Sequence, residues 1–510
     1  MTSDEANRGI ADIAIIGGGV NGCGIARDAA GRGLKVVLFE AHDLASATSS
    51  ASTKLIHGGL RYLEYYEFRL VREALLDREV LLRAAPMLVR PLRFVLPHSP
   101  EQRPAWLIRL GLFLYDHLGG RQILPASGRA RLGDTPEGRP LQDWVKQAFY
   151  YSDAQVDDSR LVVLNALAAQ SLGAEILTGT RCRHAVREGR RWVAELEDRA
   201  SGAVRTVRAR ALVNAAGPWV SDFLQHDLKL DTKSRVRLVK GSHIVTRRLH
   251  DGPHAYILQN DDKRIVFVIP WLGEFSLIGT TDIPYDGKPQ DVRISPEETD
   301  YLLRVVNRHF KKPIAESDIV WSYAGVRPLY DDASANPSAV TRDYTFDLNA
   351  PDGAAPLLSI FGGKITTYRR LAEHAVQKLA PLVGMDRPDW TAGTPLPGGD
   401  LADPDAFTAE LRRRHPWLPE RLARRLVAAY GTRVALVLGD AQRLDDLGPC
   451  YGADLHEAEV RYLVEQEWAR TAEDILWRRS KLGLFLDDEE VQRLRARLER
   501  PRAASAVDAA

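Results

Sequence analysis

A glycine-rich turn between two apolar segments near the N-terminus constrains the fold more than any other feature of this chain. The segment 12–40 reads DIAIIGGGVNGCGIARDAAGRGLKVVLFE. An apolar run near each end has the length of a buried parallel strand. Between them, Gly17-x-Gly19-x-x-Gly22 opens a stretch of small residues that is compatible with a helix. The order of strand, glycine turn, helix and strand is that of a βαβ unit that binds a dinucleotide.

Each glycine of this turn has its own physical role. Gly17 permits the tight turn, Gly19 lets the backbone approach a pyrophosphate, and Gly22 lets the helix pack closely on the strand. The N–H groups at the start of the helix carry a partial positive charge that attracts phosphates. Glu40 ends the second strand, where its carboxylate can accept hydrogen bonds from ribose hydroxyls. A purely structural turn is the alternative, but both strands and the acid favour dinucleotide binding.

Length and composition indicate a multidomain globular protein. A chain of 510 residues is too long for one core, so we expect two or three domains. The formal net charge of +1 gives no global field that would recruit nucleic acid. Cys23, Cys182 and Cys450 form no metal-binding spacing and suit a reducing compartment. The polar N-terminus lacks a signal-peptide pattern, so we expect a cytoplasmic location.

The hydrophobic pattern changes along the chain. Residues 235–282 contain short β-rich runs between Gly, Pro and Asp turns, which predicts an antiparallel meander. Residues 385–404 are rich in Pro, Gly and Asp and are typical of a linker, whereas 405–500 has helical periodicity. We therefore expect an α/β fold, α+β overall. The first part is an oxidoreductase domain over 1–384. It has a Rossmann-like cofactor lobe (about 10–95, 150–234 and 320–384) and an antiparallel β-rich substrate lobe (mainly 96–149 and 235–319). After the linker we expect an all-helical C-terminal domain at 405–500 and a disordered tail at 501–510.

Two later glycine segments indicate a flavin rather than a diffusible nicotinamide. Residues 215–219 read AAGPW, and residues 361–364 read FGGK at the start of a predicted helix. Such turns offer backbone donors to the isoalloxazine ring, which lies far from the adenosine end of the cofactor. We predict FAD in preference to NAD.

Two histidines are candidates for a general base. His57 follows the nucleotide unit and precedes Gly58-Gly59, where a flat ring can approach. His243, in KGSH on the first strand of the predicted meander, competes with it. A structural histidine bonded to neighbouring backbone is the alternative for each.

Several cationic residues stand at the ends of predicted elements and favour an anionic substrate. They are Arg61, Arg327, Arg342 and Lys364. The planar fork of arginine matches a phosphate, and each charge-assisted hydrogen bond contributes roughly 1.5–3 kcal/mol. A structural ion pair is the alternative for each residue, and Asp343 is a candidate partner of Arg342.

No apolar run reaches the roughly 20 residues that a membrane-spanning helix needs. The nearest is 106–115, WLIRLGLFLY, which Arg109 and Gly111 interrupt. Its length fits a buried core helix, whereas its terminal aromatic residues and nearby arginines suit a helix that lies on an anionic lipid surface. Both interpretations remain open. The basic cluster 412–414, most simply a solvated face, is a second candidate for membrane contact.

Longer segments carry a resemblance to a known family. Residues 47–75 read ATSSASTKLIHGGLRYLEYYEFRLVREAL, and KGSHIV, YILQNDDKRIVFVIPW, IGTTD, GVRPL, TRDY and FGGKITTYRRLAEHA follow later. The chain resembles the FAD-dependent glycerol-3-phosphate dehydrogenases of the bacterial aerobic type, strongly over about 10–380 and in outline beyond. The resemblance implies a fold like that of D-amino-acid oxidase and oxidation of sn-glycerol 3-phosphate to dihydroxyacetone phosphate. It also implies electron transfer to ubiquinone or menaquinone, peripheral attachment to the cytoplasmic membrane, and a homodimer.

The resemblance also implies roles for particular residues. FAD contacts are implied at Gly17, Gly19, Gly22, Glu40, Thr48, Ser49, Lys54, Leu55, His57, Gly217, Gly362, Gly363 and Thr366. Substrate contacts are implied at Arg61, Tyr62, Thr280, Arg327, Arg342 and Lys364, with His57, Arg61 and Lys364 as catalytic residues. No metal is expected, because the calcium-binding loop of the mitochondrial members, Asp-x-Asp-x-Asp-Gly, has no counterpart here. The alternatives are an oxidase, including an amino-acid oxidase on the same fold, and a flavin-dependent RNA-modifying protein, against which the balanced charge argues.

Overall fold

The protein divides into two compact units, Met1–Pro395 and Leu396–Ala510. The computed structural model describes residues 9–99, 103–230, 235–262, 264–331 and 343–499. The boundary between the units lies inside the predicted linker 385–404. The expected tail at 501–510 lies outside the described residues.

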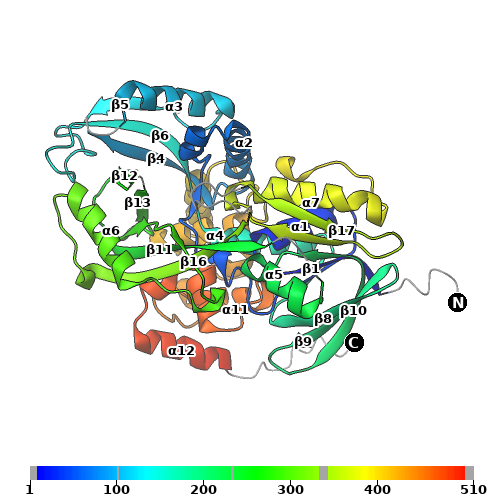
Figure 1. The fold of residues 1–510 in the computed structure, drawn as a ribbon. Helices are drawn as coiled ribbons and strands as arrows, with labels where there is room; N and C mark the ends of the chain where they lie inside the picture. The colour runs from blue at the N-terminus through cyan, green and yellow to red at the C-terminus, as the bar shows by residue number, and fades with distance from the viewer. Residues whose placement is uncertain (1–8, 100–102, 231–234, 263, 332–342, 500–510) are drawn as a thin grey trace. The chain divides into compact units, whose positions relative to one another are not determined.

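The first unit contains an eight-stranded sheet with the predicted βαβ unit at its centre (Figure 1). The order is β17-β18-β10-β1-β2-β7, and β9 and β8 extend it from β10 as an antiparallel hairpin. The pairs from β18 through to β7 are parallel. The strands are β1 (Ile10–Ile16), β2 (Val36–Phe39), β7 (Glu175–Leu177), β8 (Thr180–Glu188), β9 (Arg191–Asp198), β10 (Val204–Asn214), β17 (Thr345–Asn349) and β18 (Leu357–Phe361).

Three helices pack beside one another on this sheet: α1 (Val20–Gly31), α4 (Asp158–Ser171) and α7 (Tyr368–Val383) (Figure 1). The small residues of α1 permit this close packing. A Cβ on Gly24 would lie 2.9 Å from the ring of Tyr368 on α7. The second half of β1 is fully apolar and buried, as expected for a parallel strand that is covered on both faces.

A second sheet of ten strands forms the remainder of the first unit. The order is β15-β11-β14-β13-β12-β4-β6-β3, with β16 paired to β11 and β5 paired to β6. The predicted meander is confirmed, because β12, β13 and β14 pair in succession and antiparallel. The strands are β3 (Leu55–Ile56), β4 (Val89–His98), β5 (Gly128–Arg131), β6 (Gln147–Val156), β11 (Val236–Arg247), β12 (Ala255–Gln259), β13 (Ile265–Trp271), β14 (Phe275–Gly279), β15 (Ile283–Pro284) and β16 (Ile319–Tyr330).

Membership of the second sheet differs from the lobe boundaries expected from sequence. Most of β4, β6 and β16 falls in ranges that we had placed in the cofactor lobe. β4 and β6 pair antiparallel over their whole length, and β16 pairs with nearly all of β11. These long ladders satisfy the backbone donors and acceptors of all four strands, so the strands join the second sheet.

The remaining helices of the first unit are α2 (Phe68–Ala84), α3 (Ala105–Leu118), α5 (Val220–Asp222) and α6 (Pro296–His309). A 3-10 turn, η3 (Leu60–Tyr65), precedes α2. Helix α6 begins with a capping box between Ser295 and Glu298. Within the part of the chain that the structure describes, no helix is both long and apolar enough to cross a bilayer.

The segment after α7 lies on the first unit. Arg32 donates to the carbonyl of Arg387 at 2.9 Å and to the carboxylate of Asp389 at 2.7 Å. A Cβ on Gly31 would lie 2.0 Å from the ring of Trp390. This Pro- and Gly-rich segment therefore makes specific contacts with the end of α1.

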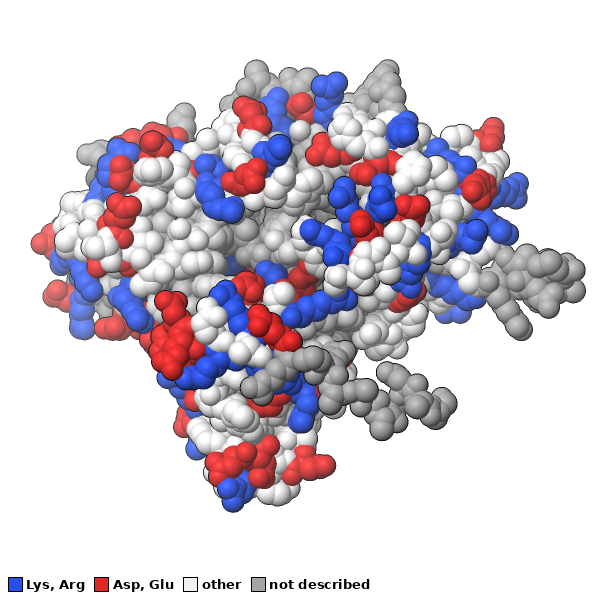
Figure 2. Space-filling view, turned by 90° about the horizontal axis from the view of Figure 1, so that it is seen from below, with Lys and Arg blue, Asp and Glu red and all other residues white. Residues whose placement is uncertain are grey.

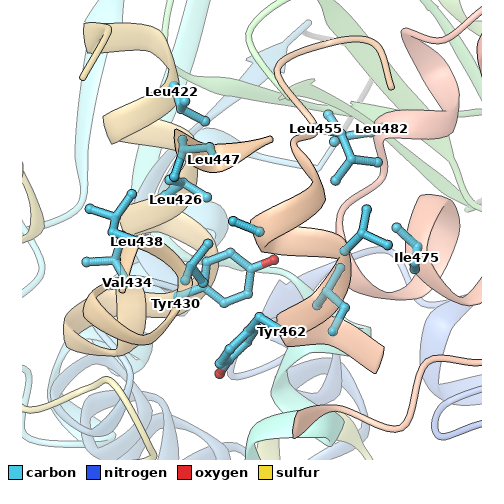
Figure 3. Packing of buried hydrophobic residues seen from close by; sticks show 14 of the residues in the cluster. Leu422, Leu426, Tyr430, Val434, Leu438, Leu447, Leu455, Tyr462, Ile475 and Leu482 are labelled. Carbon is cyan, nitrogen blue, oxygen red and sulfur yellow. The ribbon is translucent and has the colours of Figure 1, made fainter. Parts of the chain in front are cut away.

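The second unit is helical, in agreement with the sequence, and has its own core. Its helices are α8 (Pro404–Arg414), α9 (Glu420–Tyr430), α10 (Val434–Leu438), α11 (Glu457–Gln466) and α12 (Asp488–Glu499). Figure 3 shows leucines and isoleucine from these helices and their connections around the rings of Tyr430 and Tyr462. Within the basic cluster at the end of α8, Arg412 pairs with Glu420 at 3.1 Å and Arg414 pairs with Glu410. These pairs fit the simpler interpretation of that cluster as a solvated face.

Candidate active site

The glycine turn after β1 has the geometry of a phosphate-binding loop. Gly17 has a φ of +107°, and a Cβ on it would lie 2.5 Å from the carbonyl oxygen of Ala215. A Cβ on Gly22 would lie 1.9 Å from the carbonyl oxygen of Gly17. Both positions therefore exclude any side chain, and the backbone at the start of α1 stays bare for a phosphate.

Glu40 is fixed beside this turn. Its carboxylate accepts hydrogen bonds from the N–H of Gly18 at 2.7 Å and of His42 at 2.8 Å. Burial raises the pKa of Glu40, and the two N–H donors oppose that rise. This position at the end of β2 is the one that an adenosine ribose requires.

Segments far apart in sequence meet at the start of α1. Ser49 accepts from the N–H of Val20 at 3.0 Å. Asn21 donates to the carbonyl of Gly362 at 3.2 Å, and a Cβ on Gly363 would lie 3.1 Å from the Asn21 amide. The loop after β2 and the FGGK turn after β18 thus both lie at the predicted dinucleotide turn.

The same loop reaches the second sheet. Thr48 donates to the carbonyl of Val326 on β16 at 2.8 Å, one residue before Arg327. His57 and Thr366 bond through the N–H and carbonyl of His57 and the hydroxyl of Thr366, each at 3.2 Å. Gly217, with a φ of +55°, follows β10 closely and lies two residues after Ala215, which contacts Gly17. The predicted cofactor residues are therefore brought together from five segments.

Lys54 and Leu55 differ from the other predicted cofactor residues. The Lys54 ammonium lies 2.9 Å from both carboxylate oxygens of Asp158 and 3.0 Å from the carbonyl of Ser50, fully buried. Leu55 is buried within β3. The Lys54 side chain therefore holds the loop 48–54 in place, and a contact of either residue with a cofactor would use the main chain. Removing one partner of such a buried pair typically costs about 3–5 kcal/mol.

Arg327 and Thr280 both lie against Gly241 of β11, a position without a side chain. A Cβ on Gly241 would lie 2.7 Å from both the Nη2 of Arg327 and the Oγ1 of Thr280. Arg327 also donates to Asp282 at 2.8 Å and keeps about a third of its side chain exposed. Sequence reasoning missed Gly241, although a glycine inside a strand often marks a site of close approach.

His243 occupies a tight, buried slot in the second sheet. Its ring stacks on Tyr323 of β16 at 4.7 Å between centroids, and on the β14 side a Cβ on Gly279 would lie 2.2 Å from it. Its Nε2 lies 3.0 Å from the Oγ1 of Thr53, and its Nδ1 has no hydrogen-bond partner among the described residues.

The surroundings of His243 determine its charge. Burial, followed by the nearby charges of Lys54 and Arg327, holds the pKa of His243 well below its ordinary value. The imidazole is therefore neutral at physiological pH, and its Nδ1 is a buried atom without a hydrogen-bond partner among the described residues.

A second cationic group lies at the FGGK turn. The Nζ of Lys364 lies 3.7 Å from the centroid of the Tyr62 ring, a cation–π contact. The Tyr62 ring covers Gly59, where a Cβ would lie 2.2 Å from it. Arg61 lies half-buried on η3, and His57 is half-buried after β3.

The segments that carry Arg327 and Lys364 approach each other. A Cβ on Gly362 would lie 3.7 Å from the carbonyl of Pro328, the residue after Arg327. Arg342 lies outside the described residues. Asp343, its suggested partner, pairs with Arg69 at 2.5 Å. Across the described parts of the chain, no cluster of three or more His, Cys, Asp or Glu side chains could hold a metal ion.

These features define a class of enzyme. A bare phosphate turn, an acid for the ribose and late glycine turns suit FAD. The second sheet adds a cation, Arg327, and a neutral imidazole, His243. The chain matches the sequence model for FAD dependent oxidoreductases over residues 12–369, and the model for the C-terminal domain of alpha-glycerophosphate oxidase over 390–499. The class is therefore that of the FAD-dependent oxidoreductases.

Sequence relatives of known name identify the family within this class. The chain is 57% identical to a glycerol-3-phosphate dehydrogenase of Pseudomonas aeruginosa, covering 95% of this chain and 94% of the relative. It is 54% identical to the aerobic glycerol-3-phosphate dehydrogenase of Escherichia coli, covering 95% and 96%. It is also 55% identical to a D-erythritol 1-phosphate dehydrogenase of Brucella abortus, covering 94% and 96%. The chain belongs to the family of FAD-dependent glycerol-3-phosphate dehydrogenases.

A solved structure agrees with this assignment. A glycerol-3-phosphate dehydrogenase from Bacillus halodurans, complexed with FAD, superposes with a TM-score of 0.76 at 27% identity, covering 97% of this chain and 95% of that chain. The predicted fold class and FAD as the cofactor are thereby confirmed.

Proposed function

We propose that this protein oxidises sn-glycerol 3-phosphate to dihydroxyacetone phosphate and delivers the electrons to a membrane quinone. The observation that carries the proposal is the meeting of Arg327 and Thr280 at Gly241, near neutral His243 and beside the turn that carries Lys364. Arg327 and Thr280 are donors that suit a phosphate. His243 is a base that suits the oxidation of a secondary alcohol. The names of the relatives point to the same substrate.

The residues divide the chemistry among them. Arg327, with Arg342, binds the phosphate, and Arg61 or Lys364 lies near the reacting end. FAD, when bound, supplies the acceptor for the hydride from carbon 2. A base takes the proton of the 2-hydroxyl, and the cations stabilise the negative charge that develops on its oxygen.

The geometry favours His243 over His57 as the base. His243 is neutral, has a ring nitrogen without a partner, and shares its strand with Gly241, where Arg327 and Thr280 meet. His57 was the stronger candidate from sequence. The main chain of His57 is hydrogen-bonded to Thr366. We therefore assign His57 to cofactor binding rather than to proton transfer.

D-Erythritol 1-phosphate is a second candidate substrate. It shares the phosphate end with sn-glycerol 3-phosphate, and a relative with that name is as similar to this chain as the glycerol-3-phosphate dehydrogenases are. The RNA-modifying alternative receives no support from the surface, because cationic and anionic side chains are interspersed on the face that Figure 2 shows.

Anaerobic mixing tests the substrate. We expect the yellow holoenzyme to lose its flavin colour with sn-glycerol 3-phosphate and to react very poorly with glycerol, because glycerol leaves the phosphate donors unpaired. Stopped-flow absorbance gives the rates. Faster bleaching by D-erythritol 1-phosphate would assign the protein to that substrate. Re-oxidation by a soluble quinone rather than by oxygen separates a dehydrogenase from an oxidase.

Helix α3 is the proposed membrane contact on the cytoplasmic face. Its outer side exposes Trp106 (67%), Phe113 (56%) and Leu110 (47%), whereas Leu112 and Tyr115 are buried. The buried side fits the core-helix interpretation, and the exposed apolar side supports the proposal of an interfacial helix. Inserting each large apolar side chain contributes roughly 1.5–3 kcal/mol, enough for reversible attachment with help from lipid charge.

Replacing Trp106 and Phe113 together with serine should weaken binding to anionic vesicles and lower quinone activity several-fold. Activity with a soluble dye should not change, because both side chains face solvent. Leu436→Ser, at an equally exposed leucine (57%) on α10, is the matched control. Vesicle co-sedimentation measures binding. Equal vesicle binding by the double variant and the control would move the membrane contact away from α3.

A further inference from the structure

Tyr115 connects helix α3 to the segment that carries proposed site residues. Its side chain points inward and is 2% exposed. Its hydroxyl accepts a hydrogen bond from the N–H of Gly58 at 2.8 Å and donates to Asp153, whose oxygens lie at 2.8 and 2.9 Å. Gly58 follows His57 directly, so the bond fixes the main chain beside that residue.

Asp153, the acceptor of the Tyr115 hydroxyl, belongs to a buried ion pair. Asp153 accepts from Arg78 at 2.6 Å, and both side chains are buried. Burial, with the charge of Asp153, raises the pKa of Tyr115 well above its ordinary value, so the hydroxyl keeps its proton. There is no spare room, because a Cβ on Gly58 would lie 2.8 Å from the Tyr115 hydroxyl and 2.5 Å from Leu75.

The segment is held at its other end as well. Glu64 on η3 accepts from Arg103, two residues before α3, with one of the bonds at 2.8 Å. That pair is about half exposed and contributes little on its own. Between Gly58 and Glu64 lie Arg61 and Tyr62, and Tyr62 carries the contact with Lys364.

We infer that Tyr115 is a positioning residue, which holds the segment 58–64 through the N–H of Gly58 and so sets Arg61 and Tyr62 against Lys364. The inference deepens the proposed function and rests on it. Tyr115 itself belongs to the buried network with Asp153, and its action on the substrate passes through the main chain.

The test compares Tyr115→Phe with Tyr151→Phe in the FAD-loaded enzyme. Tyr151 is a suitable control, because its ring is buried in the same cluster, 5.7 Å from that of Tyr115, without a bond to Gly58. We expect Tyr115→Phe to raise KM for the phosphorylated substrate about tenfold, the scale of one lost hydrogen bond. FAD content and the rate of reduction by dithionite should stay at the wild-type level. Tyr151→Phe should keep the wild-type KM.

Hydrogen exchange provides a readout that needs no substrate. Peptides that cover 57–66 should exchange faster in Tyr115→Phe than in the wild type or the control. Unchanged exchange there would overturn the inference, whichever substrate the enzyme uses. A lower Tm with wild-type KM and kcat would also overturn it, since that pattern belongs to a merely structural tyrosine. Failure of the proposed function would appear separately, as a wild-type enzyme that sn-glycerol 3-phosphate does not reduce, and KM would then be measured with D-erythritol 1-phosphate.

Discussion

Arg327→Ala should lower kcat/KM for sn-glycerol 3-phosphate by roughly 10²–10⁴, on the scale of lost charged hydrogen bonds. The Nη2 of Arg327 and the hydroxyl of Thr280 both lie against the backbone of Gly241, and about a third of the Arg327 side chain is exposed. A phosphate placed there would replace solvent as the partner of this cation. Since binding energy at the phosphate positions the reacting carbon, the loss should appear in flavin reduction as well as in KM. FAD content should not change.

The ion pair with Asp282 supplies the control for this prediction. Arg327 donates to Asp282 at 2.8 Å, and both side chains are partly exposed, so the pair contributes little to stability. Asp282→Asn keeps the guanidinium and weakens the pair. If Arg327 serves only that pair, the two variants will lose activity to the same small extent, tenfold or less. A large loss in Arg327→Ala alone assigns the residue to the substrate.

The sequence was sufficient for those parts of the site that local pattern determines. The glycine turn and Glu40 belong to one continuous βαβ unit, so spacing alone predicts how they come together. The FGGK turn was predicted to serve the same cofactor, and the structure brings it to Asn21 at the start of α1. In each case a short apolar strand places the next polar residue at its carboxyl end.

The parts that sequence could not predict depend on pairing across strands. Gly279 and Tyr323 flank His243 because β14 and β16 pair with β11 in one particular register. A shift of one residue would send His243 to the opposite face. The sequence around Tyr323 and Gly279 gives no sign that they flank His243, because that contact arises only from strand pairing.

Long-range partners explain the remaining differences. The Lys54 ammonium is taken by Asp158, 104 residues away, which no spacing rule reveals. Helix α3 was ambiguous because a stretch of ten largely apolar residues fits both a core helix and an interfacial helix. The packing of Leu112 and Tyr115 decides which side is buried, and that depends on α2 and the second sheet.

His243→Asn should lower the rate of flavin reduction by roughly 10²–10⁴, the usual contribution of a general base. Asparagine is smaller than the imidazole and fits between Tyr323 and Gly279, but it accepts no proton. His57→Asn should reduce the rate much less. Anaerobic stopped-flow reduction of the two variants, each with full FAD content, makes the comparison. If His57→Asn loses most of the rate and His243→Asn keeps it, the roles are reversed.

The pH dependence of the wild type distinguishes the same two residues. A base must be neutral to accept a proton, and burial holds the pKa of His243 well below the ordinary value for histidine. The rate of reduction in the free enzyme should therefore remain high as the pH falls below about 6.5, where an unperturbed histidine would become charged and inactive. The same depressed pKa also makes the stability of the fold depend on pH. Below about 6.5 the unfolded chain binds a proton at this position that the folded protein does not, so the free energy of unfolding falls with falling pH. His243→Asn lacks that proton site, so its Tm should decline less between pH 7 and pH 5 than the wild-type Tm does. A rate that drops with an apparent pKa near 6.5, together with an unchanged dependence of Tm on pH in His243→Asn, would contradict the assignment of the base to this buried slot.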